Sequence, residues 1–255
     1  MKQEITSIHS LECLTNEILE LTFVSEYLAS VAKPGQFINI RVGENFPLLR
    51  RPFSIFSIDG NNVSIVFNVI GTGTKVLARK RNGDTIDVLC PCGINFLSFV
   101  DDTFETAIFV AGGIGVAPFP FLTKNFPKNK KIVTYLGGRH KELIVEKNLT
   151  NVKIATDDGS LGFKGTVLDL IKDDFAKNNY NNVRFFLCGP TRMMKAVADF
   201  AKGIGAECYA SLECDMACGI GLCQGCNIEM IGGEKKYKLV CKEGTIFETQ
   251  TVKLL

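Results

Sequence analysis

The chain has 255 residues and a hydrophobic content of 46%, which suit a globular protein of two domains and a small appendage. Its net charge of +2 gives no electrostatic footprint for nucleic acid or an anionic membrane, and its two histidines are too few to favour a Rieske-type site or a histidine-based catalytic centre. The N-terminus has no apolar core of signal-peptide length, so we expect a cytoplasmic protein whose clustered cysteines bind metal.

Residues 1–100 contain short alternating segments separated by turns. Apolar side chains alternate with polar ones over residues 37–42 and 63–69, and Ile86 and Val88 continue the pattern. No long amphipathic helix interrupts these segments. Residues 1–100 are therefore predicted to form a small closed antiparallel β-barrel.

Two segments of this barrel suit a bound anion. Residues 50–54, Arg-Arg-Pro-Phe-Ser, place a guanidinium and a hydroxyl around a predicted rigid turn. Residues 71–75, Gly-Thr-Gly-Thr-Lys, follow a strand and begin a predicted short helix. Taken alone, each segment could be an ordinary turn, with the arginine solvated.

Together these segments resemble the flavin-binding elements of the ferredoxin-reductase superfamily. The resemblance implies that FAD is contacted by Arg51, Pro52, Phe53, Ser54, Asn68, Val69, Ile70, Gly73 and Thr74. Cys90-Pro91-Cys92-Gly93 stands where that family often has Gly-Pro-Leu-Gly. We interpret the two cysteines as residues of a barrel-closing loop that have no redox role.

Residues 101–206 alternate between strands and helices, which predicts a parallel sheet covered by helices. The expected strands are 106–111, 131–136, 152–156 and 184–187, and the expected helices are 116–126 and 191–202. Residues 106–123 carry no charge and are long enough to span a membrane. Their glycines and prolines instead indicate a strand, a turn and the start of a buried helix, so no membrane span is expected.

Glycine-rich loops follow the expected strands of this region. Ligands of open α/β sheets gather at the carboxyl ends of strands, where exposed amides can bind a phosphate. The Gly-Gly-Ile-Gly-Val-Ala-Pro and Cys-Gly-Pro segments resemble the nicotinamide-nucleotide half of the same superfamily, which implies NAD contacts by Gly112, Gly113, Gly115, Asp157, Asp158, Cys188, Gly189 and Pro190.

Three points in this region stay open. Cys188 could equally be an inert buried thiol, and Met193 and Met194 are interpreted as core residues. Arg139 could serve the 2'-phosphate of NADP, whereas a carboxylate would favour NAD. The resembling family uses NAD, and we adopt that expectation.

Residues 207–255 contain four cysteines at the spacing of plant-type ferredoxins. Intervals of four, two and fourteen residues predict a 2Fe-2S cluster ligated by Cys218, Cys223, Cys226 and Cys241. Three of these ligands share one glycine-rich loop, and the fourth is expected at the end of a strand over residues 237–241. The alternatives are a zinc site, whose cysteines usually form two separate pairs, and Cys214 as a substitute ligand.

The three predicted parts can work together because a flavin exchanges electron pairs with a nicotinamide and single electrons with a cluster. Their order, and the segments ACGIGLCQGC and VCKEGTIF, resemble the electron-transfer subunits of B-type, NAD-dependent dihydroorotate dehydrogenase. The resemblance implies FAD, a 2Fe-2S cluster and NAD as cofactors. It also implies an FMN-containing catalytic subunit as partner in a heterotetramer, and electron flow from dihydroorotate to NAD in pyrimidine biosynthesis.

Two further functions compete with this one. The chain also resembles the small flavin and iron-sulfur subunit of an NADH-dependent ferredoxin:NADP oxidoreductase or a sulfhydrogenase-like complex, although the former tends to have Asp where Cys218 stands. A non-catalytic redox sensor is the other alternative. If the protein were only a binding module stabilised by zinc, the purified protein would show neither flavin nor cluster absorption.

Overall fold

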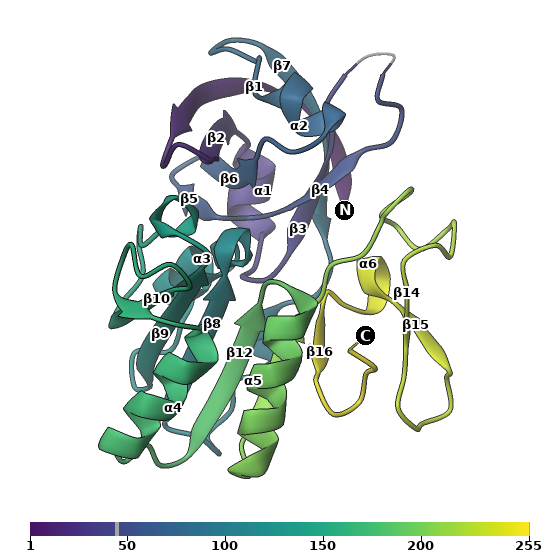
Figure 1. The fold of residues 1–255 in the computed structure, drawn as a ribbon. Coiled ribbons are helices and arrows are strands. Elements are labelled where there is room, and N and C mark those ends of the chain that lie inside the picture. Colours follow the sequence, from purple (N-terminus) through teal and green to yellow (C-terminus); the bar gives the residue numbers. More distant parts are fainter. Residues whose placement is uncertain (44–45, 255) are drawn as a thin grey trace.

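The computed structural model describes residues 1–43 and 46–254. Figure 1 shows a curled sheet (purple to blue), an α/β part below it (teal to green) and a C-terminal segment (yellow) at the side of the α/β part. No helix within the described residues is both long and apolar enough to cross a membrane.

The first part is an antiparallel sheet of seven strands in the order β4-β3-β7-β1-β2-β6-β5. Its strands are β1 (Lys2–Cys13), β2 (Ile18–Val24), β3 (Phe37–Arg41), β4 (Arg51–Ser54), β5 (Ser57–Asp59), β6 (Asn62–Asn68) and β7 (Thr85–Cys92). β4 and β5 form opposite edges of the sheet, yet only Ile55 and Phe56 separate them in the chain. The sheet therefore has to curl into a half-closed barrel, which confirms the predicted fold class.

Apolar residues that alternate along the strands fill the interior of this barrel. Leu21, Phe23, Ile38, Ile40 and Ile65 are each fully buried, because every second side chain of a strand points to the same face. Two short helices, α1 (Glu26–Val31) and α2 (Thr72–Leu77), belong to this part, and α1 contacts β6 and β7. The predicted helix at residues 71–75 is thus confirmed.

The second part is a sheet in the order β11-β10-β9-β8-β12-β13-β16. Its strands are β8 (Thr106–Gly112), β9 (Lys131–Gly138), β10 (Val152–Thr156), β11 (Phe163–Lys164), β12 (Val183–Cys188), β13 (Glu207–Ser211) and β16 (Ile246–Glu248). All neighbours pair in parallel except β13 and β16. A parallel sheet covered by helices was the prediction for this region, and it is confirmed.

Helices cover both faces of this parallel sheet. α4 (Val167–Lys177) and α5 (Thr191–Gly203) lie together on one face (Figure 1), and α3 (Phe119–Asn125) contacts β5 of the barrel. Three short 3-10 segments complete the helical elements, η1 (Phe96–Phe99), η2 (Gly113–Val116) and η3 (Lys141–Leu143). Every residue of β8 is buried, as expected for a central strand with both faces covered.

Phenylalanines fill the layer between the sheet and the barrel. The rings of Phe109 and Phe119 stack with centroids 5.3 Å apart, and Phe186 meets the Phe109 ring edge-on at 5.8 Å. Aromatic pairs in such arrangements contribute roughly 1 kcal/mol each beyond their buried area. This layer joins the second sheet to the barrel.

The C-terminal segment has little regular structure of its own. It contains hairpin β14 (Asn227–Glu229) and β15 (Tyr237–Leu239), the short helix α6 (Val240–Glu243) and strand β16. β16 pairs with β13, so this segment also completes the second sheet. Cys226, Val240, Cys241 and Val252 share a core with α5.

The structure corrects four local predictions. Cys241 lies in α6 and not at the end of a strand, because the extended segment ends at Leu239. Cys90 and Cys92 lie in β7 and not in a closing loop, with both side chains buried. Residues 51–54 form edge strand β4 instead of a turn. An edge strand tolerates Pro52 because one side of the strand has no partner, so the missing backbone N–H of proline breaks no ladder hydrogen bond. The predicted helix 116–126 is shorter, beginning at Phe119 after a 3-10 turn.

Candidate functional site

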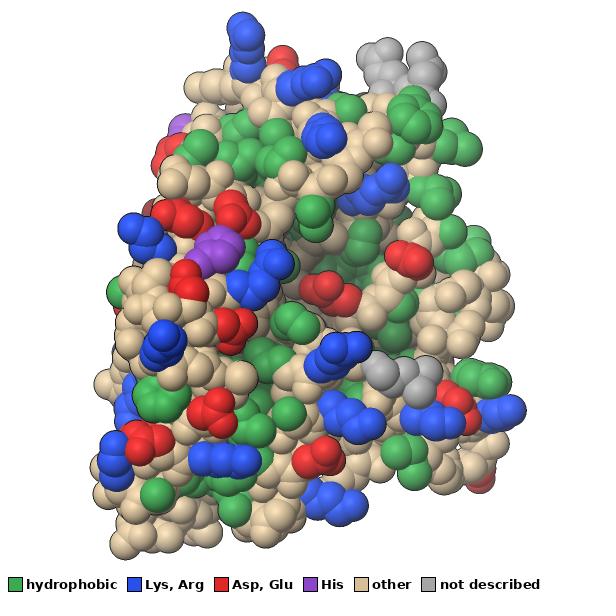
Figure 2. Space-filling model, in the orientation of Figure 1, with side chains coloured by type: hydrophobic (Ala, Val, Ile, Leu, Met, Phe, Trp, Pro, Cys, Tyr) green, Lys and Arg blue, Asp and Glu red, His purple; other side chains and the backbone are tan. Residues whose placement is uncertain are grey.

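A cleft of about 1510 Å³ is lined by residues from the barrel, the second sheet and the C-terminal segment. Figure 2 shows this face of the molecule hollowed near its centre. Of the residues predicted to bind cofactors, the cleft brings together Asn68, Val69, Ile70, Gly112, Gly113, Gly115, Asp157, Gly189 and Pro190. It is large and open enough to admit more than one ligand.

The glycine turn after β8 packs against the loop after β12. A side chain at Gly115 would collide with the carbonyl oxygen of Cys188, and one at Gly112 would lie 2.6 Å from the Met193 sulfur. Only glycine permits this approach, which leaves the backbone amides of the turn at the carboxyl end of the sheet. The geometry suits a phosphate or another anion.

The other residues of the predicted nucleotide set lie beside this turn. Asp157 lines the cleft, whereas Asp158 turns back and accepts the Ser160 N–H at 2.8 Å. The Ser160 hydroxyl and N–H lower the pKa of Asp158. Cys188 is 2% exposed, and its burial raises the pKa of its thiol. Cys188 therefore stays a neutral thiol beneath the cleft floor.

The two methionines that were interpreted as core residues both pack in the core and both line the cleft. Met194 is the more buried of the two, at 3% exposed. Met193 packs against the same core and lies beside Gly112. Arg139, the residue that could serve the 2'-phosphate of NADP, lines the same cleft near Asp157.

The barrel presents apolar side chains to the cleft. Val69 is 42% exposed and Ile70 is 83% exposed, which is unusual for such residues and suits a flat aromatic ligand. The Thr74 hydroxyl holds this segment by accepting the N–H groups of Ile70 and Gly71, both at 3.1 Å. These residues fit the ring system of a flavin.

The remaining predicted flavin residues lie on β4 and α2, outside the lining of the cleft. Arg51 donates to the carbonyl oxygen of Leu49 at 2.7 Å and packs against Gly73. Pro52, Phe53 and Ser54 follow along β4 and are partly exposed. Arg50, in contrast, donates from Nη2 to both carboxylate oxygens of Asp87 on β7, each at 2.8 Å. Its guanidinium is therefore already paired within the barrel.

The four predicted cluster ligands form an inner and an outer pair. Cys226 and Cys241 are buried with their sulfur atoms 3.1 Å apart. Cys218 and Cys223 lie on the outer loop, where the Cys223 N–H donates to the Cys218 sulfur at 3.4 Å. Two pairs of sulfurs, one facing the core and one facing solvent, fit the two irons of a 2Fe-2S cluster.

The backbone of the outer loop already stabilises a thiolate. Desolvation would raise the pKa of Cys218, but the N–H groups of Cys223 and Ile220 outweigh it and lower that pKa to about 6. Gly219 and Gly221 adopt positive φ angles of 67° and 83°, which turns the amides of the loop toward the sulfur. Within the described residues, no three acidic, His or Cys side chains converge as a site for a single metal ion.

Sequence reasoning missed one residue of this region. Glu213 lines the cleft, and surrounding protein raises the pKa of its carboxyl group although its surface is open to the cleft. Cys214, the alternative ligand considered from the sequence, lies beside Cys226, where burial and the neighbouring sulfur raise its pKa to about 12. The Ser-Leu-Glu-Cys segment after β13 was the available signal, since residues at the carboxyl end of a strand line ligand sites.

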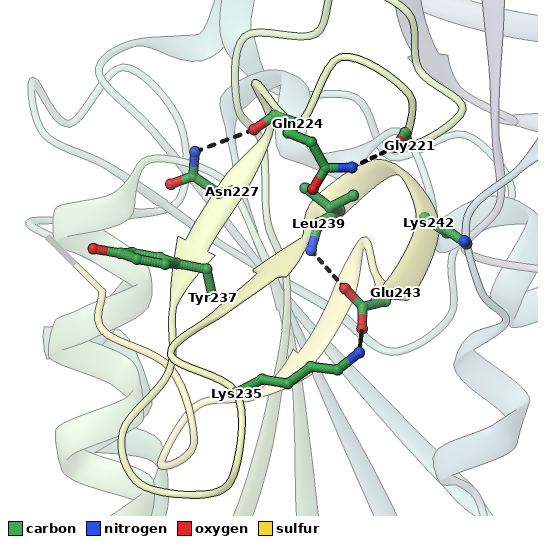
Figure 3. Close-up of a pocket in the computed structure, with 8 residues that line it drawn as sticks. All are labelled: Gly221, Gln224, Asn227, Lys235, Tyr237, Leu239, Lys242 and Glu243. Atoms are coloured by element: carbon green, nitrogen blue, oxygen red, sulfur yellow. Dashed lines mark hydrogen bonds and ion pairs between the residues drawn. The ribbon is translucent and has the colours of Figure 1, made fainter.

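A second pocket, of about 820 Å³, lies between the cluster loop and hairpin β14–β15 (Figure 3). Lys235 pairs there with Glu243 at 2.9 Å, and the Glu243 carboxylate also accepts the N–H of Leu239. A separate pair of hydrogen bonds runs from the Asn227 amide to the Gln224 carbonyl oxygen and from the Gln224 amide to the Gly221 carbonyl oxygen. This pocket lies beside the loop of the outer ligands and has a mixed polar and apolar lining.

Comparison with known proteins agrees with this geometry. The sequence profile of the iron-sulfur cluster binding domain of dihydroorotate dehydrogenase B matches residues 213–253. The electron transfer subunit of dihydroorotate dehydrogenase B (NAD(+)) from Bacillus pumilus is 36% identical over 262 residues, covering 100% of this chain and 99% of that protein. The subunit of the same name from Fusobacterium nucleatum is 36% identical over 266 residues and covers 100% of both chains.

Solved structures share the fold. A structure of the NADH-dependent reduced ferredoxin-NADP oxidoreductase superposes with a TM-score of 0.86 at 27% identity, covering 98% of this chain and 90% of that chain. A ferredoxin NADP+ reductase from Neisseria gonorrhoeae superposes with a TM-score of 0.67 at 17% identity, covering 80% and 92%, and supports the fold alone. On the full-length identity to its relatives, the chain belongs to the family of dihydroorotate dehydrogenase B (NAD(+)) electron transfer subunits.

Proposed function

We propose that this chain carries electrons between NAD and an FMN-containing dihydroorotate dehydrogenase catalytic subunit, through a 2Fe-2S cluster and FAD. The single cleft lined by the barrel, the parallel sheet and the cluster segment supports this most strongly, because three redox groups have to meet in one chain. When bound, the flavin exchanges an electron pair with the nicotinamide and single electrons with the cluster.

Each cofactor has its own proposed residues. The division into 1–100 for FAD, 101–206 for NAD and 207–255 for the cluster follows the chain order. FAD is held by Arg51, Pro52, Phe53, Ser54, Asn68, Val69, Ile70, Gly73 and Thr74. NAD is held by Gly112, Gly113, Gly115, Asp157, Gly189 and Pro190, with Asp158 and Cys188 in the loops behind them, and the cluster is held by Cys218, Cys223, Cys226 and Cys241.

The residues of the chain position these groups and exclude water. Val69 and Ile70 give the flavin ring an apolar support, and the Gly112–Gly115 turn offers amides to the pyrophosphate. The N–H groups on the Cys218 sulfur stabilise the thiolate that ligates iron. The chain thereby sets the spacing and the potentials of the transfer steps.

The electron path has to continue on another polypeptide. The cluster loop presents Leu222, which is 77% exposed, and the exposed Cys223 to the outside of the molecule. We propose that the FMN-containing subunit receives or donates electrons here, in a cytoplasmic heterotetramer that serves pyrimidine biosynthesis. The electrons of dihydroorotate then reach NAD.

Anaerobic affinity purification from the native host tests this function. The co-purifying protein is assayed for dihydroorotate-driven reduction of NAD, and we expect an FMN protein that forms orotate. A large flavoprotein or hydrogenase subunit without orotate formation would contradict the proposed pathway and leave the three cofactors in place.

One observation favours a second function. The superposition on the NADH-dependent reduced ferredoxin-NADP oxidoreductase structure covers nearly the whole chain. A role as the small subunit of such an oxidoreductase would make reduced ferredoxin the electron source. Oxidation of reduced ferredoxin by the purified complex, without activity toward dihydroorotate, would decide in its favour.

A further inference from the structure

Hairpin β14–β15 and the residues after β16 form a wall of the nucleotide cleft. Asn227, Glu229, Tyr237 and Lys253 line the same cleft as the glycine turn after β8. All four belong to the segment that holds the cluster cysteines, more than 100 residues after that turn. The wall therefore joins the cluster segment to the nucleotide site.

The wall is tied in place on two sides. At its base, the Val240 N–H donates to the Cys226 carbonyl oxygen at 2.8 Å, next to the two buried ligand sulfurs. At its outer side, the Lys253 N–H donates to the Glu229 carbonyl oxygen at 2.9 Å. Held at both sides, the side chains of the wall keep a fixed position relative to the cleft.

The order of strands decides which half of the dinucleotide reaches this wall. Arg139 and Asp157 follow β9 and β10, on one side of the central strand β8. The wall lies on the other side, beyond β12 and β13, where β16 leads into the C-terminal residues. If the pyrophosphate lies on the glycine turn, adenosine extends toward β10 and the nicotinamide half toward the wall.

The side chains of the wall suit a neutral polar ligand with a flat ring. The Glu229 carboxylate accepts a hydrogen bond from Lys253 Nζ at 3.2 Å and has further lone pairs for sugar hydroxyls or an amide N–H. Tyr237 is 48% exposed, and in Figure 3 its ring points away from the Lys235–Glu243 ion pair. The Lys236 ammonium lies over one face of this ring, 5.3 Å from its centroid, so Tyr237 offers the other face and a hydroxyl.

We propose that Tyr237 and Glu229 contact the nicotinamide riboside half of bound NAD(H). The cluster segment thus has a second role besides electron transfer, since its hairpin positions the nicotinamide against the flavin. This inference rests on the proposed function, because it takes NAD(H) as the ligand of the cleft.

The test measures the dissociation constant of NADH for the full chain loaded with FAD and cluster. Tyr237→Ala and Glu229→Ala are each expected to weaken NADH binding roughly fivefold, because each loses one ring contact or one hydrogen bond. Lys238→Ala is the matched control, because Lys238 is next to Tyr237 on β15 and does not line the cleft. Flavin and cluster absorption report that each variant is intact.

AMP provides the second probe, because it contains only the adenosine half. Both variants are expected to bind AMP as the unaltered chain does. Unchanged NADH binding in both variants would overturn the inference, as would an equal loss for NADH and AMP, which would indicate a general distortion. An unaltered chain that bound no NADH would instead remove the proposed function, and the inference with it.

Discussion

The α/β part and the cluster segment position their sites in opposite ways. The α/β part rests on a buried sheet and a phenylalanine core, and its glycine turn is fixed by backbone packing against the loop after β12. The cluster segment contains three three-residue strands and a four-residue helix, and only its inner cysteines, Cys226 and Cys241, lie in the core shared with α5. Packing of the sheet positions the first site, whereas we expect the second to depend on bound metal for its stability.

The largest effect is expected from removing a cluster ligand. Cys223→Ser should abolish the cluster absorption and electron passage to the partner, because the outer pair of ligands is broken. At saturating NADH, reduction of FAD should continue, since the α/β part does not depend on the metal. Cys13→Ser, at an exposed thiol of β1, is the control. A Cys223→Ser chain that reduced its partner at the normal rate would show that the cluster is not the relay.

We expect the stability of the α/β part to depend on its own packing and ion pairs and not on the cluster. The pair of Lys153 and Asp174 tests this expectation. Asp174 on α4 accepts hydrogen bonds from Tyr135 and Lys153, both on the sheet. Asp174→Ala removes the acceptor that Tyr135 and Lys153 share and leaves the buried Tyr135 hydroxyl without this partner, whereas Lys153 keeps the Tyr180 hydroxyl. We expect a loss of about 3 kcal/mol in the free energy of unfolding. The cluster spectrum of the folded chain should stay unchanged. Denaturant titration measures the loss.

Asp173→Ala is the matched control for that substitution. Its carboxylate pairs with Lys177 on the exposed face of the same helix. Such a pair contributes about 0.5 kcal/mol or less. Equal losses in the two variants would mean that the buried network does not anchor α4.

The glycine turn is expected to respond to a single added methyl group. In Gly115→Ala, the new carbon collides with the Cys188 carbonyl, and we expect a cost of about 1–3 kcal/mol, shared between stability and NADH affinity. Isothermal titration with NADH, together with the melting temperature, separates the two. Gly203→Ala near the end of α5 meets no atom within 4 Å and should bind NADH normally. Normal NADH binding by both variants would contradict a role of the turn in binding.

The smallest expected effect concerns the pH dependence of stability. Although Glu213 is open to the cleft, desolvation by the surrounding protein raises its pKa above the ordinary value of 4.5. The folded chain therefore retains a proton that the unfolded chain has lost, and stability falls as the pH rises from 4.5 through the folded pKa. Glu213→Gln should remove this decline, seen as a flatter curve of melting temperature against pH. An unchanged slope would show that Glu213 ionises freely in the cleft.

Residues with strong local patterns were predictable from the sequence. Strand β10 is found at residues 152–156 as expected, and α5 spans 191–203 against an expected 191–202. In α5 the apolar residues recur at helical spacing, and Met194, Val197, Ala198 and Ala201 form the buried face. The cysteine spacing was equally informative about the predicted cluster ligands. The first three cysteines are close enough in sequence to share one loop, whereas the distant fourth comes from another segment.

Contacts between distant segments were not predictable in the same way. The short helix at Cys241 is held by tertiary contacts that its four residues do not encode. Nothing near Arg50 in the sequence indicates Asp87 as its partner, and the approach of β14–β15 to the cleft depends on where β16 pairs. Each of these features follows from chain topology, which a single sequence constrains only weakly.

The pairing of β16 with β13 limits how this protein can be divided. A polypeptide shortened to end before Ile246 would lose the last strand of the second sheet and leave the backbone groups of β13 open along one edge. Open edges pair with other chains and promote aggregation. The cluster-bearing segment is therefore no detachable module, and a natural fusion or an engineered transplant of it would have to carry part of the nucleotide sheet along.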